Sequence, residues 1–532
     1  MQMVQVKDWG FCYPGCEAPA LSHVNFTIEE GAFVLLCGAS GSGKSTLLSH
    51  LKREMAPHGT QMGVIEWQGS PLSAMSEKDS AQRIGYVAQT PETQIVTDTV
   101  WHELAFGLEN LGMPAQVMRR RVAEIAHFFG IESWFRQKTD TLSGGQKQLV
   151  NLASVLVMQP SLLILDEPTA QLDPVAARQF LQAVQRVHKE LGITVLLCEH
   201  ALEEVLGLAT QVLFLQDGAL AFDGAPQAFL QRMAAPSSAH FRSALPAASR
   251  LALSLGKTEP IPVTVQQGRR LLRAQRAHVS VRSYQTHQGG KASPVLCAKE
   301  LWFRYQTELP FVLRGFSMSL FAGEIHALVG GNGCGKSTAL AVLCGGYKPQ
   351  RGKCKGKVQT ALLAQDTRAM FAHDTVEAEL RQTARIHGQM ERWEEVTEKL
   401  QIAPLLPKHP YDISVGERQR AALAKCLLTG AGVLLLDEPT KGMDAFSKHR
   451  LAGLLATAKR MGQAVCLVTH DLEFAAAVAD RCSMMFDGTV MATDQGRAFF
   501  LGNQFYTTAV HRMTQGILPG CVVQEDLVFD AT

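Results

Sequence analysis

The chain contains the same ordered series of short motifs twice, and this repetition limits the folds open to it more than any other feature. Four residues of the first half recur in the same order in the second half: Lys44 as Lys336, Ser143 as Ser414, Glu167 as Glu438, and His200 as His470. An ordered series with nearly constant spacing indicates a tandem duplication rather than chance similarity. We therefore expect two domains of one architecture.

Each half alternates short apolar runs with helical patterns. The runs FVLLCG at 33–38, LLILD at 162–166 and VLLLD at 433–437 are apolar almost throughout, which is typical of central strands buried on both faces. The alternation predicts an α/β fold with a mostly parallel sheet covered by helices. We place the two domains at residues 1–235 and 293–532.

The segment between the two copies, residues 236–292, has a different composition. It is rich in Ala, Ser, Arg and Gln and lacks sustained apolar periodicity. This predicts a surface linker, with at most a short helix. Its basic run from Arg269 to Arg282 has two interpretations, namely contact with RNA or lipid phosphates, or a solvated face of the linker, and the second is the more common use of such runs.

Composition excludes several classes of protein. Of the 532 residues, 46% are hydrophobic and 19% charged, which is typical of a folded protein, and the net charge of +2 provides no general basic field for nucleic acid. No apolar run is long enough to span a bilayer, and the first residues lack a signal-peptide core, so we expect a cytoplasmic chain unless a partner holds it at a membrane. Cysteines occur without a C-x-x-C pair, which favours reduced, buried thiols; Cys334 alone lies where oxidation would affect a site.

Two glycine-rich loops follow apolar runs and precede helical patterns. Their residues are Gly38, Ala39, Ser40, Gly41, Ser42, Gly43, Lys44, Ser45 and Thr46 in the first half, and Gly330, Gly331, Asn332, Gly333, Cys334, Gly335, Lys336, Ser337 and Thr338 in the second. Glycines let backbone N–H groups surround phosphate oxygens, and the following helix adds its N-terminal dipole. The pattern predicts that the two lysines contact β- and γ-phosphates and that Ser45 and Ser337 ligate Mg²⁺.

Paired carboxylates end the second apolar run of each half. Asp166 and Asp437 suit a further Mg²⁺ contact, and Glu167 and Glu438 follow directly. A carboxylate beside the metal can polarise the attacking water as a general base. The same two-residue sequence also occurs at ordinary strand ends, but here it is followed by Pro-Thr in both copies.

A third motif starts a helix upstream of each carboxylate pair. It comprises Ser143, Gly144, Gly145 and Gln146 in the first half, and Ser414, Val415, Gly416 and Glu417 in the second. A hydroxyl, free amides and a positive dipole end form an anion site at a helix N-terminus. Together with the loops and carboxylates, this motif resembles the signature of the ABC ATPase family, and the resemblance covers nearly the whole chain outside the linker.

The resemblance implies ATP and Mg²⁺ as cofactors and hydrolysis of ATP as the reaction. It also implies that each domain carries an antiparallel β subdomain and a helical subdomain beside the parallel core. In that family two domains pair head to tail, so that the signature of one closes on the nucleotide held by the loop of the other. In this chain the two halves would pair with each other.

Further positions match the family one at a time. Tyr13 and Tyr305 match the aromatic residue that stacks on adenine, although an exposed tyrosine at a strand edge is the simpler interpretation of either. Three further pairs match family positions near the γ-phosphate or the dimer seam. Gln89 and Gln365 match the glutamine that contacts Mg²⁺ and water, and His200 and His470 match the histidine that contacts the γ-phosphate. Asp173 and Asp444 match the loop that lies across the dimer seam.

The signature differs between the halves, so the two sites should be unequal. Under head-to-tail pairing the Lys336 loop meets the signature at Ser143, and the Lys44 loop meets the one containing Val415 and Glu417. The valine side chain restricts the backbone, and the glutamate adds a negative charge near an anion, but the serine hydroxyl remains. We predict two competent sites, of which the one at Lys44 is slower or weaker.

The segment from Gln89 to Pro114 indicates which kind of ABC ATPase the chain resembles. Its QTPETQ start and AFGLEN run, together with the tail FFLGNQFYTTAVHRM, are similar to the double ATPases of energy-coupling factor (ECF) importers. In those systems a membrane scaffold subunit docks on the ATPases, and a small membrane subunit captures a vitamin, vitamin precursor or transition-metal ion. The resemblance implies docking surfaces at about residues 90–112 and 366–380, and a location at the cytoplasmic face of the membrane. The second segment lacks AFGLEN.

Two other functions remain open at this stage. One is a soluble twin-ATPase translation factor on ribosomes, but the linker is only weakly charged and helical, and we expect no nucleic-acid partner. The other is a double ATPase of a sugar importer, which typically loses catalytic residues in one half, whereas this chain retains them in both. The transported solute does not touch the ATPase and leaves no pattern in its sequence, so a thiamine precursor is only one candidate.

Overall fold

The computed structural model describes residues 1–16, 18–235, 241–256, 259–282, 293–356 and 358–529. The chain divides into two compact units: unit 1 comprises Met1–Pro246 and Thr258–Thr264, and unit 2 comprises Ala247–Lys257 and Val265–Thr532. The side chain of Val415 is not among the parts of the chain that the structure describes. The predicted difference between the two ATP sites rests partly on that side chain. No helix among the described residues is both long and apolar enough to cross a membrane.

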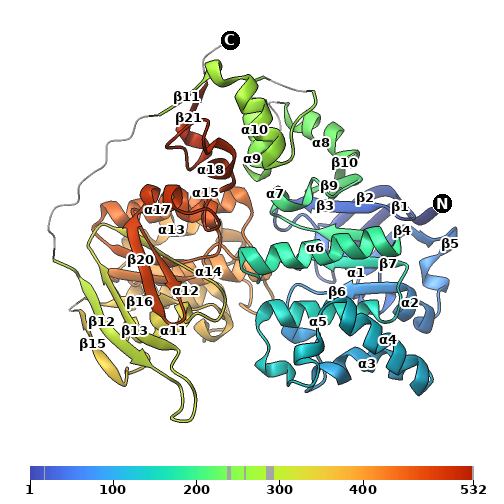
Figure 1. The fold of residues 1–532 in the computed structure, drawn as a ribbon, viewed down its shortest axis with the longest axis horizontal. Helices are drawn as coiled ribbons and strands as arrows, with labels where there is room; N and C mark the ends of the chain where they lie inside the picture. Colours follow the sequence, from blue (N-terminus) through green and yellow to red (C-terminus); the bar gives the residue numbers. More distant parts are fainter. Residues whose placement is uncertain (17, 236–240, 257–258, 283–292, 357, 530–532) are drawn as a thin grey trace. The chain divides into compact units, whose positions relative to one another are not determined.

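Unit 1 is built on a six-stranded sheet with the order β10-β9-β3-β8-β7-β6 (Figure 1). The strands are β3 (Phe33–Gly38), β6 (Ile84–Val87), β7 (Leu162–Asp166), β8 (Thr194–Cys198), β9 (Gln211–Gln216) and β10 (Ala219–Gly224). All neighbours are parallel except β9 and β10. Strands β3, β7 and β8 are buried at every residue, which confirms the prediction of central strands.

A second, antiparallel sheet with the order β2-β1-β4-β5 forms the β subdomain of unit 1. Its strands are β1 (Gln2–Cys12), β2 (Leu21–Glu29), β4 (Thr60–Trp67) and β5 (Ser70–Pro71). The larger helices are α1 (Lys44–His50), α2 (Glu77–Arg83), α3 (Val100–Asn110), α4 (Ala115–Phe128), α5 (Gly144–Leu156), α6 (Pro174–Leu191) and α8 (Pro226–Met233). Helices α3, α4 and α5 pack together as the helical subdomain. The expected three-part domain is therefore present.

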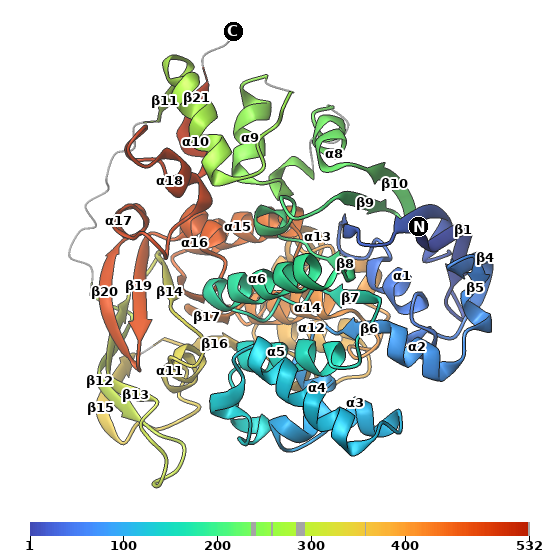
Figure 2. The same ribbon diagram turned by 45° about the vertical axis from the view of Figure 1, so that its right-hand side comes forward.

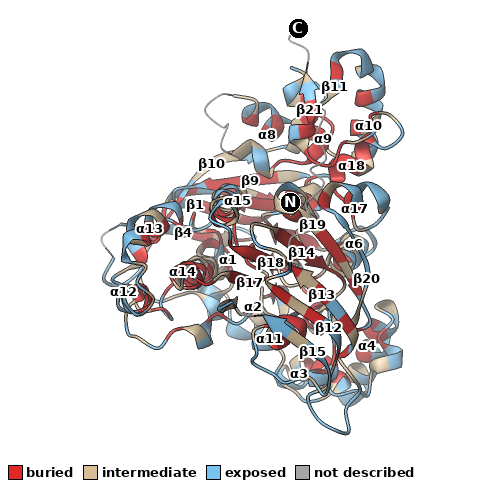
Figure 3. Cartoon of the chain, turned by 90° about the vertical axis from the view of Figure 1, so that its left-hand side faces the viewer, coloured by how far each residue is buried: buried red, intermediate tan, exposed pale blue. Residues whose placement is uncertain are grey.

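Unit 2 repeats this plan. Its main sheet has the order β16-β17-β18-β14-β19-β20 and its β subdomain the order β13-β12-β15. The strands are β12 (Leu296–Phe303), β13 (Leu313–Leu320), β14 (Ile325–Val329), β15 (Arg351–Gly356), β16 (Thr360–Leu363), β17 (Val433–Asp437), β18 (Ala464–Val468), β19 (Arg481–Phe486) and β20 (Thr489–Gln495). Figure 3 shows β14, β17 and β18 buried along their length beneath partly exposed helices.

The helices of unit 2 correspond to those of unit 1. They are α11 (Lys336–Leu343), α12 (Val376–Ile386), α13 (Trp393–Lys399), α14 (Val415–Leu427), α15 (Ala445–Arg460), α16 (Leu472–Val478) and α17 (Gly496–Gly502). Helix α11 follows the second glycine-rich loop as α1 follows the first, and α14 starts at the second signature as α5 starts at the first. The duplication predicted from the motifs is thus a duplication of structure.

The expected surface linker differs from what the structure shows. Helices α9 (Ala247–Ser254) and α10 (Val265–Ala274) and strand β11 (Val279–Val281) pack with helix α18 (Ala509–Thr514) and strand β21 (Leu527–Phe529) (Figure 2). Strands β11 and β21 are antiparallel. Described residues 259–264 belong to unit 1 instead. We call this assembly of α9, α10, β11, α18 and β21 the composite subdomain.

The composite subdomain has a core of its own. Its buried side chains come from both sequence regions: Ala247, Ala248, Leu251, Leu272, Val279, Ala509, Val510, Met513, Leu518, Cys521 and Leu527. The apolar positions in 247–282 are few because each helix is only about two or three turns long, which explains why no sustained periodicity was visible. These apolar side chains are buried against residues 509–529, a contact that the sequence analysis did not predict.

Candidate nucleotide sites

The glycine-rich loops hold their lysines in the same way in both units. Lys44 is 5% exposed, and its Nζ donates to the backbone oxygens of Gly38 at 3.1 Å and Ala39 at 2.7 Å. Lys336 Nζ donates to the oxygens of Gly330 at 3.0 Å and Gly331 at 2.8 Å. Each ammonium is thus fixed against its own loop, where it offers a positive charge to an anion.

The last glycine of each loop has a backbone conformation that side chains disfavour. Gly43 has φ 96° and Gly335 has φ 101°, both in the left-handed region. A Cβ on Gly43 would lie 2.7 Å from the backbone oxygen of Ala20. Glycine is therefore required where the loop turns into helix α1, and the turn directs the first N–H groups of that helix into the loop.

The aspartates at the ends of β7 and β17 lie beside the loop serines. Ser45 Oγ donates to Asp166 Oδ1 at 3.3 Å, and Tyr86 donates its hydroxyl to Oδ2 at 3.1 Å. Burial, followed by the charge of Glu167, raises the pKa of Asp166 above its usual range. Burial likewise raises the pKa of Asp437, against a hydrogen bond from Ser337 that lowers it.

These oxygens fit the Mg²⁺ that an ATP site needs. The hydroxyl of Ser45 and the carboxylate of Asp166 are hard oxygen donors of the kind Mg²⁺ prefers, and they already lie together. Ligand atoms of Asp166, Glu167 and Cys198 all lie within 4.8 Å of one another. Burial raises the pKa of the Cys198 thiol well above its ordinary value, so that group stays protonated and is no ligand for a hard cation.

The glutamates that follow share an uncommon backbone conformation. Glu167 has φ 45° and Glu438 has φ 50°, which side chains other than Asn, Asp and Gly rarely adopt. Each backbone N–H donates to the adjacent strand, to Cys198 O at 3.0 Å and Val468 O at 2.9 Å respectively. Strain of this kind is concentrated at functional sites.

In unit 1 the carboxylate of Glu167 is held by two predicted partners. His200 Nε2 lies 2.7 Å from Oε1, and Gln89 Nε2 donates to Oε2 at 2.9 Å. Burial by itself raises the pKa of Glu167, but the hydrogen bond and charge of His200 and the charge of Lys44 outweigh it, so the pKa lies below its ordinary value. The carboxylate is therefore ionised at neutral pH.

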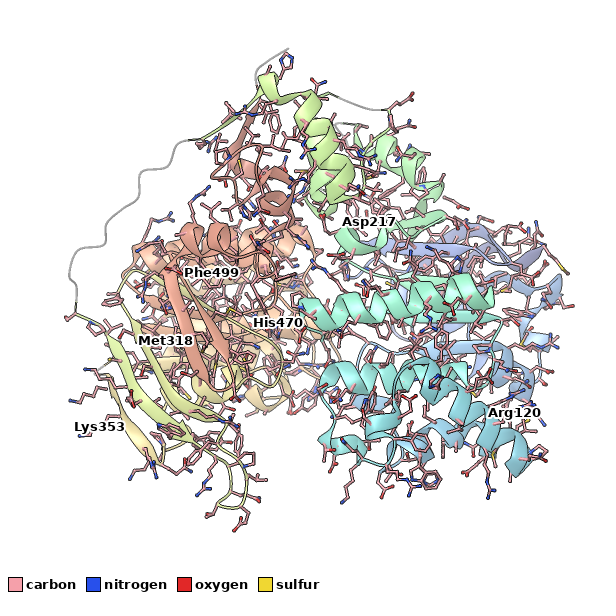
Figure 4. All side chains as sticks on the ribbon, in the orientation of Figure 1. Arg120, Asp217, Met318, Lys353, His470 and Phe499 are labelled. Atoms are coloured by element: carbon pink, nitrogen blue, oxygen red, sulfur yellow. The ribbon has the colours of Figure 1, made fainter. Side chains whose placement is uncertain are left out.

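In unit 2 the corresponding carboxylate is in a different state. His470, labelled in Figure 4, follows strand β18, and its Nε2 lies 3.3 Å from Glu438 Oε1, while its backbone N–H donates to Oε2 at 3.2 Å. Burial, followed by the charge of Asp437, raises the pKa of Glu438 to about 8. Gln365 is exposed, whereas Gln89 is half-buried.

Both signatures begin their helices with the same reciprocal hydrogen bonds. Ser143 Oγ accepts from the N–H of Gln146 at 3.3 Å, and the Gln146 side chain accepts from the N–H of Ser143 at 2.9 Å. Ser414 and Glu417 make the same pair at 3.3 and 2.8 Å. The second motif is thus an intact capping box in which glutamate replaces glutamine, so the substitution conserves the helix start.

The predicted tyrosines and aspartates each contact the start of a helix. The hydroxyl of Tyr13 is 3.0 Å from Thr46 Oγ1, and that of Tyr305 is 2.9 Å from Thr338 Oγ1, so both exposed rings stand at the helix that follows the loop. Two aspartates cap the helices after the carboxylate pairs: Asp173 accepts from the N–H groups of Val175 and Ala176, and Asp444 accepts from that of Ser447.

Sequence reasoning missed Tyr86 and Glu199. Tyr86 lies three residues before Gln89, and unit 2 has Leu362 at the equivalent strand position, so the duplication gave no signal for it. Glu199 directly precedes His200 and is 4% exposed; Thr169 donates to its Oε1 from Oγ1 at 2.6 Å and from the backbone N at 3.2 Å. The only signal for Glu199 was its place beside the predicted histidine.

The comparisons with known proteins agree with this geometry. Residues 21–170 and 313–441 match the family model described as ABC transporter. A protein of Bacillus anthracis, provisionally named an ABC transporter ATP-binding protein, is 41% identical over 541 residues, covering 98% of this chain and 97% of its own length. The chain belongs to the ABC transporter family and is an ATP-binding, ATP-hydrolysing protein with two ABC domains.

Two further similarities are more distant. A Bacillus subtilis protein, provisionally named HMP/thiamine import ATP-binding protein YkoD, is 32% identical over 514 residues, covering 91% of this chain and 90% of its own length. An archaeal ribosome recycling factor, aABCE1, solved in complex with the ribosomal stalk protein aP1, aligns with a TM-score of 0.60 and 18% identity over 93% of this chain and 91% of that one. At that identity the likeness shows the fold alone.

Proposed function

We propose that this chain is the ATPase subunit of an ECF-type importer of a vitamin, vitamin precursor or metal ion. The membership in the ABC transporter family supports a transport role, and the name of the Bacillus subtilis relative favours a vitamin precursor as the solute. The chain itself would lie at the cytoplasmic face of the membrane, held there by a scaffold subunit. A small membrane subunit would capture the solute.

The exposed apolar side chains in and before helix α3 carry this proposal. Val96, Trp101 and Phe106 are 62%, 45% and 38% exposed. They lie in the segment 90–112, which begins one residue after Gln89, and Gln89 contacts Glu167. Exposed apolar side chains that recur within one short segment favour a protein contact there. A partner bound here would be linked to the catalytic carboxylate through one glutamine.

In unit 2, polar residues take the places of two of these exposed apolar side chains. Glu377 and Gln382 of α12 occupy the positions of Trp101 and Phe106, and Glu377 forms an ion pair with Arg381 at 2.7 Å. The loop before each helix is nevertheless built alike, because Glu103 and Glu379 each accept two backbone N–H groups from it. We therefore propose that the scaffold contacts unit 1 through apolar side chains and unit 2 through polar ones.

For the chemistry we propose that the halves pair head to tail around ATP. Lys44, Ser45 and Asp166 would hold Mg-ATP in unit 1, with Lys336, Ser337 and Asp437 in the same roles in unit 2. When bound, Mg²⁺ would neutralise charge on the phosphate oxygens. Glu167 and Glu438 would accept a proton from the attacking water, and His200 and His470 would orient those carboxylates.

Co-purification from membranes tests the proposal. The tagged chain should recover a small hydrophobic complex of scaffold and capture subunits, and Trp101→Glu should abolish that recovery because it buries a charge in an apolar contact. Leu191→Glu, at a side chain that is 56% exposed on another helix, is the matched control and should leave recovery unchanged. Recovery of ribosomes instead would establish the translation-factor alternative, and recovery of a large permease with a solute-binding protein would establish the sugar-importer alternative.

A further inference from the structure

Glu199 has no counterpart in unit 2. It directly precedes His200 at the end of β8, whereas the residue that precedes His470 is Thr469. Both are buried, at 4% and 0% exposed. A carboxyl group with so little access to water needs hydrogen-bond partners to remain in place.

Those partners connect two parts of the catalytic centre of unit 1. Oε1 of Glu199 accepts both donors of Thr169, which follows Glu167 by two residues, and the carboxyl group also accepts the backbone N–H of His200. Glu199 thus ties the turn after Glu167 to the backbone of the histidine whose ring contacts Glu167 at 2.7 Å. The three residues and Glu199 form a closed ring of contacts.

Unit 2 lacks this ring. The hydroxyls of Thr440 and Thr469 lie 3.3 Å apart, and the N–H of Asp471 donates to Thr469 Oγ1 at 3.0 Å. The backbone N–H of His470 turns to Glu438 itself, and the ring Nε2 lies farther from that carboxylate than in unit 1, at 3.3 Å against 2.7 Å.

We propose that Glu199 is a positioning residue that holds the backbone of His200 and Thr169, aims the His200 ring at Glu167, and thereby makes the two catalytic centres chemically different. The proposal rests on the proposed role of Glu167 and Glu438 as general bases. It adds that a single buried position decides how the histidine is held against its base.

The ionisation of the surrounding groups agrees with this geometry. The titratable groups that face Glu167 are Lys44, Asp166, Glu199 and His200, and its pKa lies below the ordinary value although burial opposes this. Burial, followed by hydrogen bonds to Thr169 and the charge of Glu167, places the pKa of Glu199 at about 7. The charge of Glu167 contributes to that rise, so the two carboxylates repel each other when both are ionised, and the hydrogen bonds from Thr169 and His200 hold Glu199 in place.

The test uses the full chain in a Glu438→Gln background, so that turnover reports the site containing Glu167. Glu199→Thr installs the residue of unit 2, and Glu199→Gln keeps an oxygen that accepts the same N–H and O–H donors. We expect Glu199→Thr to lower kcat by about tenfold and to leave KM for ATP unchanged, because the histidine and the base are misaligned while the nucleotide contacts remain. Glu199→Gln should restore most of the wild-type kcat, and the Kd for ATP should be unchanged in both.

The reciprocal exchange is Thr469→Glu in a Glu167→Gln background, which should raise kcat at the site that contains Glu438. This second exchange also decides the matter if Glu199→Thr does not fold. An unchanged kcat in either exchange, or a loss in Glu199→Gln equal to that in Glu199→Thr, would overturn the positioning role. Undiminished hydrolysis in the double variant Glu167→Gln/Glu438→Gln would instead refute the assignment of the bases, so the two failures are distinguishable.

Discussion

The imidazole Nε2 of His200 lies 2.7 Å from the carboxylate oxygen Oε1 of Glu167. That contact lowers the pKa of Glu167, whereas Glu438, whose histidine lies farther away, has a pKa of about 8. A general base works only when it is ionised. The two sites should therefore respond differently to pH, and four experiments follow from this and other features.

The first prediction concerns the pH dependence of each site. In Glu167→Gln, hydrolysis depends on Glu438, whose raised pKa keeps it protonated below about pH 8, so kcat/KM should rise about tenfold between pH 7 and pH 9. In Glu438→Gln, hydrolysis depends on Glu167, which is already ionised, and kcat/KM should be nearly constant over the same range. Two profiles of the same shape would contradict the assignment.

The same pair of variants ranks the sites. Above about pH 8 both bases are ionised, and the altered signature alone should make the site at Lys44 the slower one. Near pH 7 Glu438 is mostly protonated, which lowers the hydrolysis rate of the site at Lys336 and brings it closer to the rate of the site at Lys44. A Glu438→Gln protein that keeps full activity at pH 9, beside an inactive Glu167→Gln protein, would show that the predicted ranking is wrong.

The second prediction concerns the charge in the altered signature. Glu417→Gln should keep the capping box, because glutamine makes the same contacts at Gln146, so the free energy of unfolding should change by less than about 0.5 kcal/mol. Removing the negative charge should increase ATP affinity at the Lys44 site, measured by nucleotide binding in Lys336→Ala. Gln146→Glu is the matched control. It adds the negative charge to the first signature and should lower ATP affinity at the Lys336 site, measured in a Lys44→Ala background.

The third prediction concerns the contact between a signature and the loop after the carboxylates. A Cβ on Gly416 would lie 2.6 Å from the backbone oxygen of Gly442, so Gly416→Ala should displace that loop and destabilise the protein by about 1–3 kcal/mol. The control is Gly144→Ala, one position before the glycine of the first signature that corresponds to Gly416; its Cβ meets nothing within 4 Å, and the unfolding midpoint should not change. Chemical denaturation followed by fluorescence measures both, and equal midpoints would refute the contact.

The fourth prediction concerns the composite subdomain. Leu272→Ala removes a fully buried side chain from its core and should destabilise it by about 2–5 kcal/mol, so that protease cleaves near residues 247–282 faster than in the wild type. Val528→Ala, at a side chain that is 38% exposed in β21, should not change the cleavage rate. Unchanged cleavage in Leu272→Ala would mean that the segment behaves as the solvated linker first expected.

Motifs with fixed spacing made much of this molecule predictable. The loops at Lys44 and Lys336, the aspartates that end β7 and β17, and the parallel sheets follow from local patterns that occur twice. Glu199 and Tyr86 occur once, and their roles depend on partners far away in the sequence, Thr169 and Asp166, that only folding brings close. The pKa difference between Glu167 and Glu438 likewise depends on burial, on the charge of Asp437 and on the 2.7 Å contact of His200, which no spacing encodes.

The composite subdomain also determines when this chain can finish folding. Helices α9 and α10 are synthesised near the middle of the chain, yet the residues that cover their apolar faces, in α18 and β21, are among the last described. During synthesis at the ribosome the apolar faces of those helices stay exposed while roughly half of the protein is still being made. A chain that ended before α18 would leave these apolar side chains exposed to chaperones and proteases. The composite subdomain can therefore fold only in a chain that includes α18 and β21.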